Sequence, residues 1–358
     1  MITTEQILDA LRNVDDPDLK KDIVTLGMVK DIHVDGKKVA FTVVLTTPAC
    51  PLKDMIRRAC ENAVKYYVDK EAEVLVNMTA HVTTKRKEPS MPGVKHIIAV
   101  ASGKGGVGKS TIAANLACAL AMQGASVGLV DADIYGPSIP IMFDVVNEKP
   151  RIQNIDGRNR MIPVESYGVK ILSIGFFADA NQAIVWRGPM AVKALNQMLN
   201  DAEWGELDYM IIDLPPGTGD IHLSIVGAVP ITGAIVVSTP QNVALADARK
   251  GVAMFRMEQI HVPVLGIVEN MAWFTPAELP ENKYYIFGRE GATRLAEDLQ
   301  VPLLGQIPLV QSICEAGDAG RPAVLQKDTP QAKAILEMAG NVVRRVAVMD
   351  AAKAEVIA

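Results

Sequence analysis

The residues with the clearest chemical potential form the run GKGGVGKS, from Gly103 to Ser110. It fits the pattern G-x-x-x-x-G-K-[ST], in which glycines let backbone N–H groups converge on phosphate oxygens. An apolar run precedes it and a helical pattern follows, so a helix N-terminus would add partial positive charge. Lys109 would neutralise the β- and γ-phosphates, and the Ser110 hydroxyl would ligate Mg²⁺. The predicted nucleotide-binding residues of this loop are Gly103, Lys104, Gly105, Gly106, Val107, Gly108, Lys109, Ser110 and Thr111.

Lys104 is a second lysine inside the loop. One interpretation is a solvated cation, which is the ordinary state of a loop lysine. The other is a second phosphate ligand, which could reach across a dimer to the nucleotide of the other subunit.

Three carboxylates follow apolar runs elsewhere in the chain. Asp131 and Asp133 come after a run that ends at Val130, and Asp213 ends the run Tyr209–Ile212. Open α/β sheets place ligands at the carboxyl ends of their strands, and an acid at such a position can hold Mg²⁺ through water. Each aspartate alone could cap a helix, but three of them beside a phosphate loop favour a magnesium site.

The elements that must position these residues follow from hydrophobic patterning. Continuous Val/Ile/Leu runs alternate with helical patterns, which predicts an α/β fold with a mostly parallel sheet flanked by helices. The runs expected as strands are His96–Ala101, Ser126–Val130, Val169–Ile174, Tyr209–Ile212, Gly233–Ser238, Val262–Val268 and Leu303–Gln306.

A smaller α+β domain is predicted ahead of this sheet, over residues 1–84. A helix opens with the capping pattern of Thr3 and Gln6, and a hairpin turns at Asp35–Gly36. A second helix is expected over Lys53–Asp69 and a further strand near Glu73–Thr83. Residues 85–95 form the predicted linker, and 96–358 the P-loop NTPase domain.

Composition excludes several classes of protein. The net charge is −5 over 358 residues, without the basic surplus of a general nucleic-acid binder. The four cysteines contain no CxxC pair, which argues against a disulfide scaffold. The two long uncharged stretches are broken by Gly, Pro or polar residues, so neither predicts a membrane span. We expect a soluble, cytoplasmic protein that binds neither nucleic acid nor membrane.

Four motifs together are more specific than the phosphate loop. They are KGGVGKST (Lys104–Thr111), VDADIYGPS (Val130–Ser138), WRGPM (Trp186–Met190) and IIDLPPGTGD (Ile211–Asp220). Over Lys95–Arg345 the chain resembles the Mrp/ApbC-type iron–sulfur cluster carriers, which are deviant Walker A ATPases related to MinD, ParA and nitrogenase iron protein. The resemblance implies a homodimer that binds ATP and hydrolyses it slowly to ADP and phosphate.

The resemblance also implies roles for single residues. Lys104 would act across the dimer, and Ser110 would ligate Mg²⁺ while Asp131 and Asp213 hold its water shell. Asp133 would orient or activate the attacking water, although Asp131 and Asp133 could exchange roles. The catalytic set is then Lys104, Lys109 and Asp133. The loop around Gly217 would sense the γ-phosphate, and Asn270 would recognise adenine, its alternative being a turn former.

The first 84 residues are similar to a small domain of iron–sulfur assembly factors, on the matches Asp16–Pro17 and Thr46–Pro51. Cys50 precedes a predicted helix N-terminus and lies near Lys53, which would favour the thiolate that binds metal. The alternative for Cys50 is a small buried hydrophobe.

The chain departs from the carriers at one point. Their CxxC shortly after Glu269–Met271 is absent, and Thr275–Glu278 stand in its place. Carboxylates are poor ligands for iron–sulfur clusters, which prefer thiolates. If a [4Fe–4S] cluster binds, Cys50 is the best candidate ligand, and Cys314 is a weaker one.

The leading hypothesis is an ATPase that carries or helps to assemble iron–sulfur clusters for apoproteins, with an assembly scaffold as a further partner. The alternative is a MinD/ParA-like positioning switch without a cluster. That alternative requires a basic membrane helix or a DNA-facing lysine patch. The tail pattern over Ala332–Met349 has few cations and indicates a core helix instead.

Overall fold

The structure is a computed structural model, and it describes residues 2–17, 21–45, 53–80, 91, 93–177, 188–276, 278–279 and 281–357. Contacts divide the chain into two units, Arg86–Val342 and a smaller one made of Met1–Lys85 with Val343–Ala358. The predicted linker lies largely outside the described residues. The proposed boundaries at 84 and 95 therefore stay predictions.

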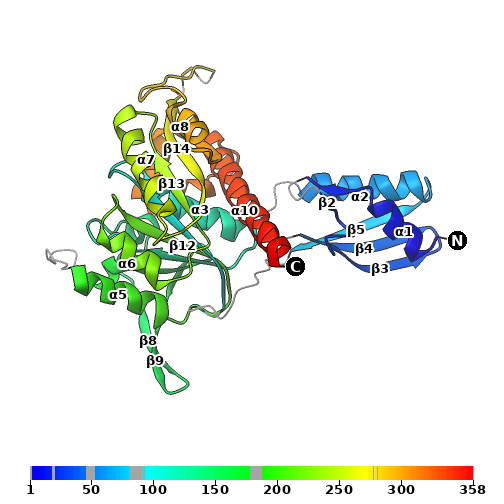
Figure 1. Cartoon of the computed structure of the whole chain (residues 1–358), viewed down its shortest axis with the longest axis horizontal. Helices are drawn as coiled ribbons and strands as arrows, with labels where there is room; N and C mark the ends of the chain where they lie inside the picture. Colours follow the sequence, from blue (N-terminus) through cyan, green and yellow to red (C-terminus); the bar gives the residue numbers. More distant parts are fainter. Residues whose placement is uncertain are drawn as a thin grey trace. The chain divides into compact units, whose positions relative to one another are not determined.

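An eight-stranded sheet forms the centre of the larger unit, in the order β10-β11-β7-β12-β6-β13-β14-β15 (Figure 1). The β10 strand pairs antiparallel with β11, and every other neighbouring pair is parallel. The prediction of a mostly parallel α/β sheet is confirmed. The sheet strands are β6 (Val94–Ser102), β7 (Val127–Asp131), β10 (Val164–Ser166), β11 (Val169–Ser173), β12 (Leu207–Pro216), β13 (Gly233–Ser238), β14 (Val264–Phe274) and β15 (Leu303–Leu309).

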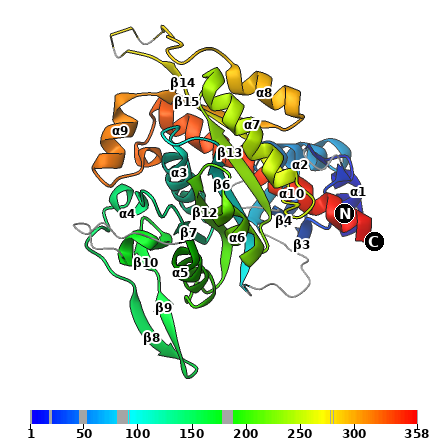
Figure 2. The ribbon, with the colours of Figure 1, turned by 60° about the vertical axis from the view of Figure 1, so that its left-hand side comes forward.

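Helices cover both faces of this sheet (Figure 2). Alternate residues of β6, such as Ile97 and Ala99, share one hydrophobic cluster with side chains of α5, α6, α7 and α8. Because strand side chains alternate, Ile98 and Val100 face the opposite side, where α3 packs on β6. The helices are α3 (Lys109–Met122), α4 (Ile139–Met142), α5 (Gly188–Asn200), α6 (Asp220–Ala228), α7 (Asn242–Arg256), α8 (Gly291–Leu299), α9 (Gln311–Asp318), α10 (Pro330–Ile357) and the 3-10 turns η1 (Ile174–Phe177) and η2 (Ala323–Leu325).

The register of the central strands determines where the carboxylates meet. Asp213 of β12 pairs with Asp131 of β7. The neighbouring strand β6 runs to Ser102, directly before the phosphate loop. Parallel strands that end at the same edge thus bring the loop and both aspartates together, as the sequence predicted.

In the larger unit, two strand features were not anticipated from the sequence. One is the short edge strand β10, and the other is a hairpin of β8 (Arg151–Ile155) and β9 (Arg158–Ile162) that projects from the larger unit (Figure 1). All but one of the β8 residues are exposed, so the hairpin lacks the apolar alternation that would have revealed it.

The smaller unit contains a three-stranded sheet in the order β3-β4-β5, antiparallel between β3 and β4 and parallel between β4 and β5. The capping box of Thr3 and Gln6 is present, and Gly36 turns the hairpin with φ +61°. The unit's elements are α1 (Thr4–Leu11), β1 (Asp15–Asp16), β2 (Lys21–Asp22), β3 (Val29–Asp35), β4 (Lys38–Leu45), α2 (Lys53–Tyr67) and β5 (Glu73–Ala80).

The helix expected near the end of the chain is present as α10. Its buried side chains include Ile335, Met338 and Val342, a spacing of three and four residues that is typical of a helix packed on a core. In the described part of the chain, no helix is both long and apolar enough to cross a membrane.

Candidate nucleotide site

The phosphate loop has the predicted context, since it joins the end of β6 to the start of α3 at Lys109. Two of its glycines have positive φ, Gly106 at +82° and Gly108 at +83°. A Cβ on Gly103 would lie 2.2 Å from the carbonyl of Asp247, and a Cβ on Gly108 would lie 2.1 Å from Asn270 Nδ2. Backbone conformation and close packing therefore both require glycine here.

A matched pair of substitutions separates these two requirements. Gly106 has the same φ as Gly108, but nothing lies within 4 Å of a Cβ built on it. We expect Gly106→Ala to cost only the conformational strain, about 1 kcal/mol, and Gly108→Ala to cost clearly more. Denaturant unfolding without nucleotide measures both, and equal losses would contradict the close packing of Gly108 against Asn270.

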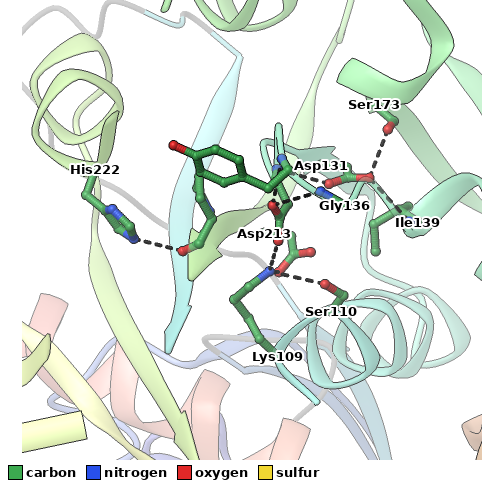
Figure 3. Close-up of polar contacts among 11 residues, drawn as sticks. Lys109, Ser110, Asp131, Gly136, Ile139, Ser173, Asp213 and His222 are labelled. Atoms are coloured by element: carbon green, nitrogen blue, oxygen red, sulfur yellow. Dashed lines mark hydrogen bonds and ion pairs between the residues drawn. The ribbon is translucent and has the colours of Figure 1, made fainter. Parts of the chain in front are cut away.

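Lys109 lies among acidic and hydroxyl groups at the start of α3 (Figure 3). Its Nζ is 2.7 Å from Asp213 Oδ1, 3.1 Å from Ser110 Oγ and 3.4 Å from Asp133 Oδ2. The side chain of Lys109 is only 6% exposed. A buried ammonium of this kind is stable because it is paired, and here the pairing directs it to the carboxylates of Asp213 and Asp133.

Both carboxylate oxygens of Asp131 accept hydrogen bonds. Its Oδ2 accepts from Ser173 Oγ at 2.8 Å and from the Ile139 N–H at 3.2 Å, and its Oδ1 accepts from the Asp133 N–H at 3.2 Å. Burial and the nearby charge of Asp213 nevertheless raise the pKa of Asp131 to about 7. A cation bound at this edge would favour the ionised form.

Asp213 and Asp133 each have at least one carboxylate oxygen that accepts no hydrogen bond from the backbone of the described residues. Burial raises the pKa of Asp213 against the opposing charge of Lys109, and Asp213 Oδ2 has no hydrogen-bond partner among the described residues. Asp133 Oδ1 accepts from the N–H groups of Tyr135 and Gly136, which leaves Oδ2 facing Lys109.

These groups fit Mg²⁺ held together with phosphate. No three His, Cys, Asp or Glu side chains in the described part of the chain form a metal site by themselves. Mg²⁺ in nucleotide sites typically takes one or two protein ligands, several waters and phosphate oxygens. The buried, unpartnered Oδ2 of Asp213 beside the Ser110 hydroxyl matches that requirement.

Asn270 of β14 lies against the C-terminal end of the loop, next to Val107 and Gly108. Its Nδ2 donates to the Val107 carbonyl at 2.9 Å, and the side chain is buried. It also lines a cavity of about 340 Å³, together with Gly108, Thr111, Met142, Pro308, Leu309 and Cys314. A largely apolar cavity with a few polar groups beside a phosphate loop is suited to a nucleoside.

Lys104 and the cysteines complete the set of predicted residues. Lys104 is exposed, and no ion pair is found for it within the described ranges. Cys60 and Cys118 are buried, which raises the pKa of each thiol to about 12. Cys314 is exposed, and its thiol donates to Asp318 Oδ2 at 3.8 Å. Cys50 falls outside the described residues.

Ser173 is a residue of this candidate site that the sequence analysis missed. It ends β11 opposite Asp131 in the register, and its hydroxyl holds that carboxylate. The sequence contained a sign of this role, since Ser173 is a polar residue at the end of a predicted strand. What the sequence did not show is that β11 is the neighbour of β7.

Comparisons with known proteins identify the family of the chain. The family described as "ParA: NUBPL iron-transfer P-loop NTPase" matches residues 93–343, and "Iron-sulfur cluster assembly protein" matches 4–76. An iron-sulfur cluster carrier protein of Synechocystis sp. is 46% identical over 97% of this chain and 98% of its own. The iron-sulfur cluster transfer protein NUBPL of Dictyostelium discoideum is 42% identical over 87% of this chain and 95% of its own.

A solved structure is also similar. It is a nucleotide-binding protein in complex with ADP from Archaeoglobus fulgidus, 37% identical, with a TM-score of 0.58 over 68% of this chain and 92% of its own. The fold, the phosphate loop and both family matches therefore agree with the resemblance inferred from the motifs. The chain belongs to the ParA-type family of NUBPL iron-transfer P-loop NTPases and carries an N-terminal region of the iron–sulfur cluster assembly family.

Proposed function

We propose that this iron–sulfur cluster carrier hydrolyses ATP to ADP and phosphate as a homodimer, and that the nucleotide controls the delivery of clusters to apoproteins. One observation carries the ATPase proposal. Lys109, at the end of the glycine loop, contacts the Ser110 hydroxyl and the carboxylates of Asp213 in β12 and of Asp133 just after the adjacent strand β7. The ADP bound to the similar Archaeoglobus protein supports a nucleotide at this loop.

Each side chain has a task that its geometry supports. Lys109 would exchange its contact with Asp213 for the β- and γ-phosphates, because phosphate oxygens carry more charge. Ser110 and Asp213 would then hold Mg²⁺, which neutralises charge that develops on the phosphates. Asp131, with its oxygens occupied, would orient the backbone at Asp133 and Ile139.

Asp133 is the better of the two candidates to activate water. Its Oδ2 faces Lys109, whereas both oxygens of Asp131 already accept hydrogen bonds. Asp133 would accept a proton as the water oxygen bonds to the γ-phosphorus and the bond to the bridging oxygen breaks. The nucleoside would occupy the cavity beside Asn270, which supports the adenine role predicted for that residue.

The cluster is cargo in this proposal, and its ligands differ from the CxxC expected of carriers. The segment Met271–Gly288, where the family pair is expected, contains no cysteine. Among the described thiols, Cys60 and Cys118 are buried and only Cys314 is exposed. We therefore propose that Cys50 of two subunits, with thiolates of a recipient, holds the cluster in transit.

Anaerobic reconstitution with iron and sulfide tests the cargo proposal. After desalting, we expect the full chain to retain both elements, and Cys50→Ser to lose most of them. Cys314→Ser is the matched control, because it removes the exposed thiol of the other unit and should leave the retained iron unchanged. Full retention by Cys50→Ser would contradict the assignment, and no retention by either protein would indicate an assembly ATPase without cargo.

The carrier proposal is favoured over a MinD/ParA-like positioning switch by the assembly-family match over residues 4–76. A switch that positions proteins on a surface has no evident use for such a region. The cytoplasmic location, the homodimer and the assembly scaffold stay predictions.

A further inference from the structure

His222 is a buried side chain with no task in the mechanism above. It lies in the first turn of α6, and its backbone N–H donates to the Gly219 carbonyl at 3.0 Å. The imidazole is 2% exposed, and its Nε2 lies 2.8 Å from the Pro215 carbonyl oxygen (Figure 3). Because a carbonyl only accepts, Nε2 carries the proton of this hydrogen bond.

The hydrogen bonds of the ring involve one of its two nitrogens. Burial lowers the pKa of His222, which favours the neutral imidazole with its proton on Nε2. Its Nδ1 is buried without a hydrogen-bond partner among the described residues. The side chain therefore donates its hydrogen bond to the backbone of the segment that follows Asp213.

That segment depends on few hydrogen bonds. Pro215 and Pro216 have no N–H, so they can be held only through their carbonyls. The pairing of β12 with β6 becomes irregular between Asp213 and Pro216. On either side of this irregularity, the Asp213 carbonyl accepts from the Ala132 N–H at 2.9 Å, and the Gly217 N–H donates to the Ser102 carbonyl at 2.9 Å. Between those two hydrogen bonds, the described part of the chain has one further hydrogen bond from a side chain, that of His222 to the Pro215 carbonyl.

The same segment lies against the phosphate loop. A Cβ built on Gly105 would be 4.0 Å from the Pro216 ring. Asp213, two residues before Pro215, is the carboxylate in contact with Lys109. A shift of Pro215–Gly217 would therefore move both the wall beside the phosphates and the carboxylate that faces them.

We propose that His222 is a positioning residue for ATP hydrolysis, which fixes the Pro215 carbonyl through Nε2–H and joins the Asp213–Gly219 segment to helix α6. The inference rests on the proposed ATPase function and extends it. Because α6 begins at Asp220, any displacement of the segment by the γ-phosphate passes to this helix through the imidazole as well as through the backbone.

Three substitutions in the full chain test this role. His222→Gln keeps an N–H donor at about the position of Nε2, His222→Asn places its amide too close to the backbone to reach Pro215, and His222→Leu removes the donor. We expect kcat for ATP hydrolysis to fall about tenfold or more in His222→Leu and His222→Asn, because small displacements of reacting groups have effects of this size. His222→Gln should stay within about threefold of the unchanged protein.

Nucleotide binding separates positioning from a general loss of structure. We expect Kd for ADP to change less than about threefold in all three variants, and the preference for ATP over ADP to fall only in His222→Asn and His222→Leu. If His222→Leu does not fold, the Gln and Asn variants decide the question between them. A kcat of His222→Asn within about twofold of the unchanged protein would overturn the inference, and so would a folded His222→Gln as slow as His222→Asn.

The same measurements test the role of His222 separately from the proposed ATPase function. An unchanged chain that does not hydrolyse ATP would contradict the proposed function, and with it the role of His222. An active chain whose His222 variants keep their kcat would contradict the role of His222 alone.

Discussion

Lys109→Ala is expected to lower the rate of ATP hydrolysis by a factor of about 100 or more, because it removes a charge preorganised for the phosphates. The substitution also leaves the carboxylate of Asp213 buried without its cation, since the two are in contact at 2.7 Å. Breaking a buried pair in this way costs about 3 kcal/mol of unfolding free energy. Phosphate release measures the rate, and denaturant unfolding measures the stability.

Two further variants make the result specific. The double variant Lys109→Ala with Asp213→Asn should recover part of the stability, because the unpaired charge is removed, and should stay inactive. Lys250→Ala removes a lysine that is 72% exposed, and its activity should be unchanged. An active Lys109→Ala protein would show that hydrolysis occurs at another site.

Lys104→Ala is expected to abolish hydrolysis while nucleotide binding and stability are retained. The side chain is exposed, and no ion pair is found for it in the part of the chain that the structure describes, in contrast to the buried and paired Lys109. Its loss should change the unfolding free energy by less than about 0.5 kcal/mol, as for ordinary surface positions. A cation supplied across a subunit interface contributes a factor of about 1,000 or more to phosphoryl transfer.

Mixing two inactive proteins tests whether Lys104 acts across the dimer. In a heterodimer of Lys104→Ala and Asp133→Ala, one of the two sites would combine an intact Asp133 with the partner's intact lysine. An equal mixture should therefore regain about a quarter of the normal rate, since half of the dimers are mixed and each has one working site. A mixture as inactive as its components would show that Lys104 acts within its own subunit.

The absent CxxC shows that motifs can predict the family of a protein without predicting its cluster ligands. The four motifs predicted the family, and the family comparisons confirmed it. The four motifs contain no ligands for a cluster. The structure also argues against two of the four cysteines as ligands. Burial leaves Cys60 and Cys118 without the thiolate character that a cluster requires. Cys50 stays the candidate because its neighbours in sequence favour the thiolate, and reconstitution is its test.

The sequence by itself determined the local chemistry of this protein. Glycines at Gly106 and Gly108, followed by a lysine and a serine at a helix start, can be identified one by one, because each requirement is local to the backbone. The apolar runs predicted the parallel strands for the same reason, since burial on both faces selects Val, Ile and Leu. The capping box and the Gly36 hairpin of the smaller unit are likewise contacts between near neighbours in the chain.

Tertiary structure decided which of these groups meet. Ser173, Asp131 and Asp213 come from three strands whose order in the sheet no local pattern encodes. Only that order makes Asp131 the fully hydrogen-bonded carboxylate and leaves an oxygen of Asp213 without a partner. The imidazole of His222 likewise reaches Pro215 because a turn folds α6 back onto its own strand. Hydrogen bonds of this kind depend on how strands and helices pack, and packing is a property of the whole chain.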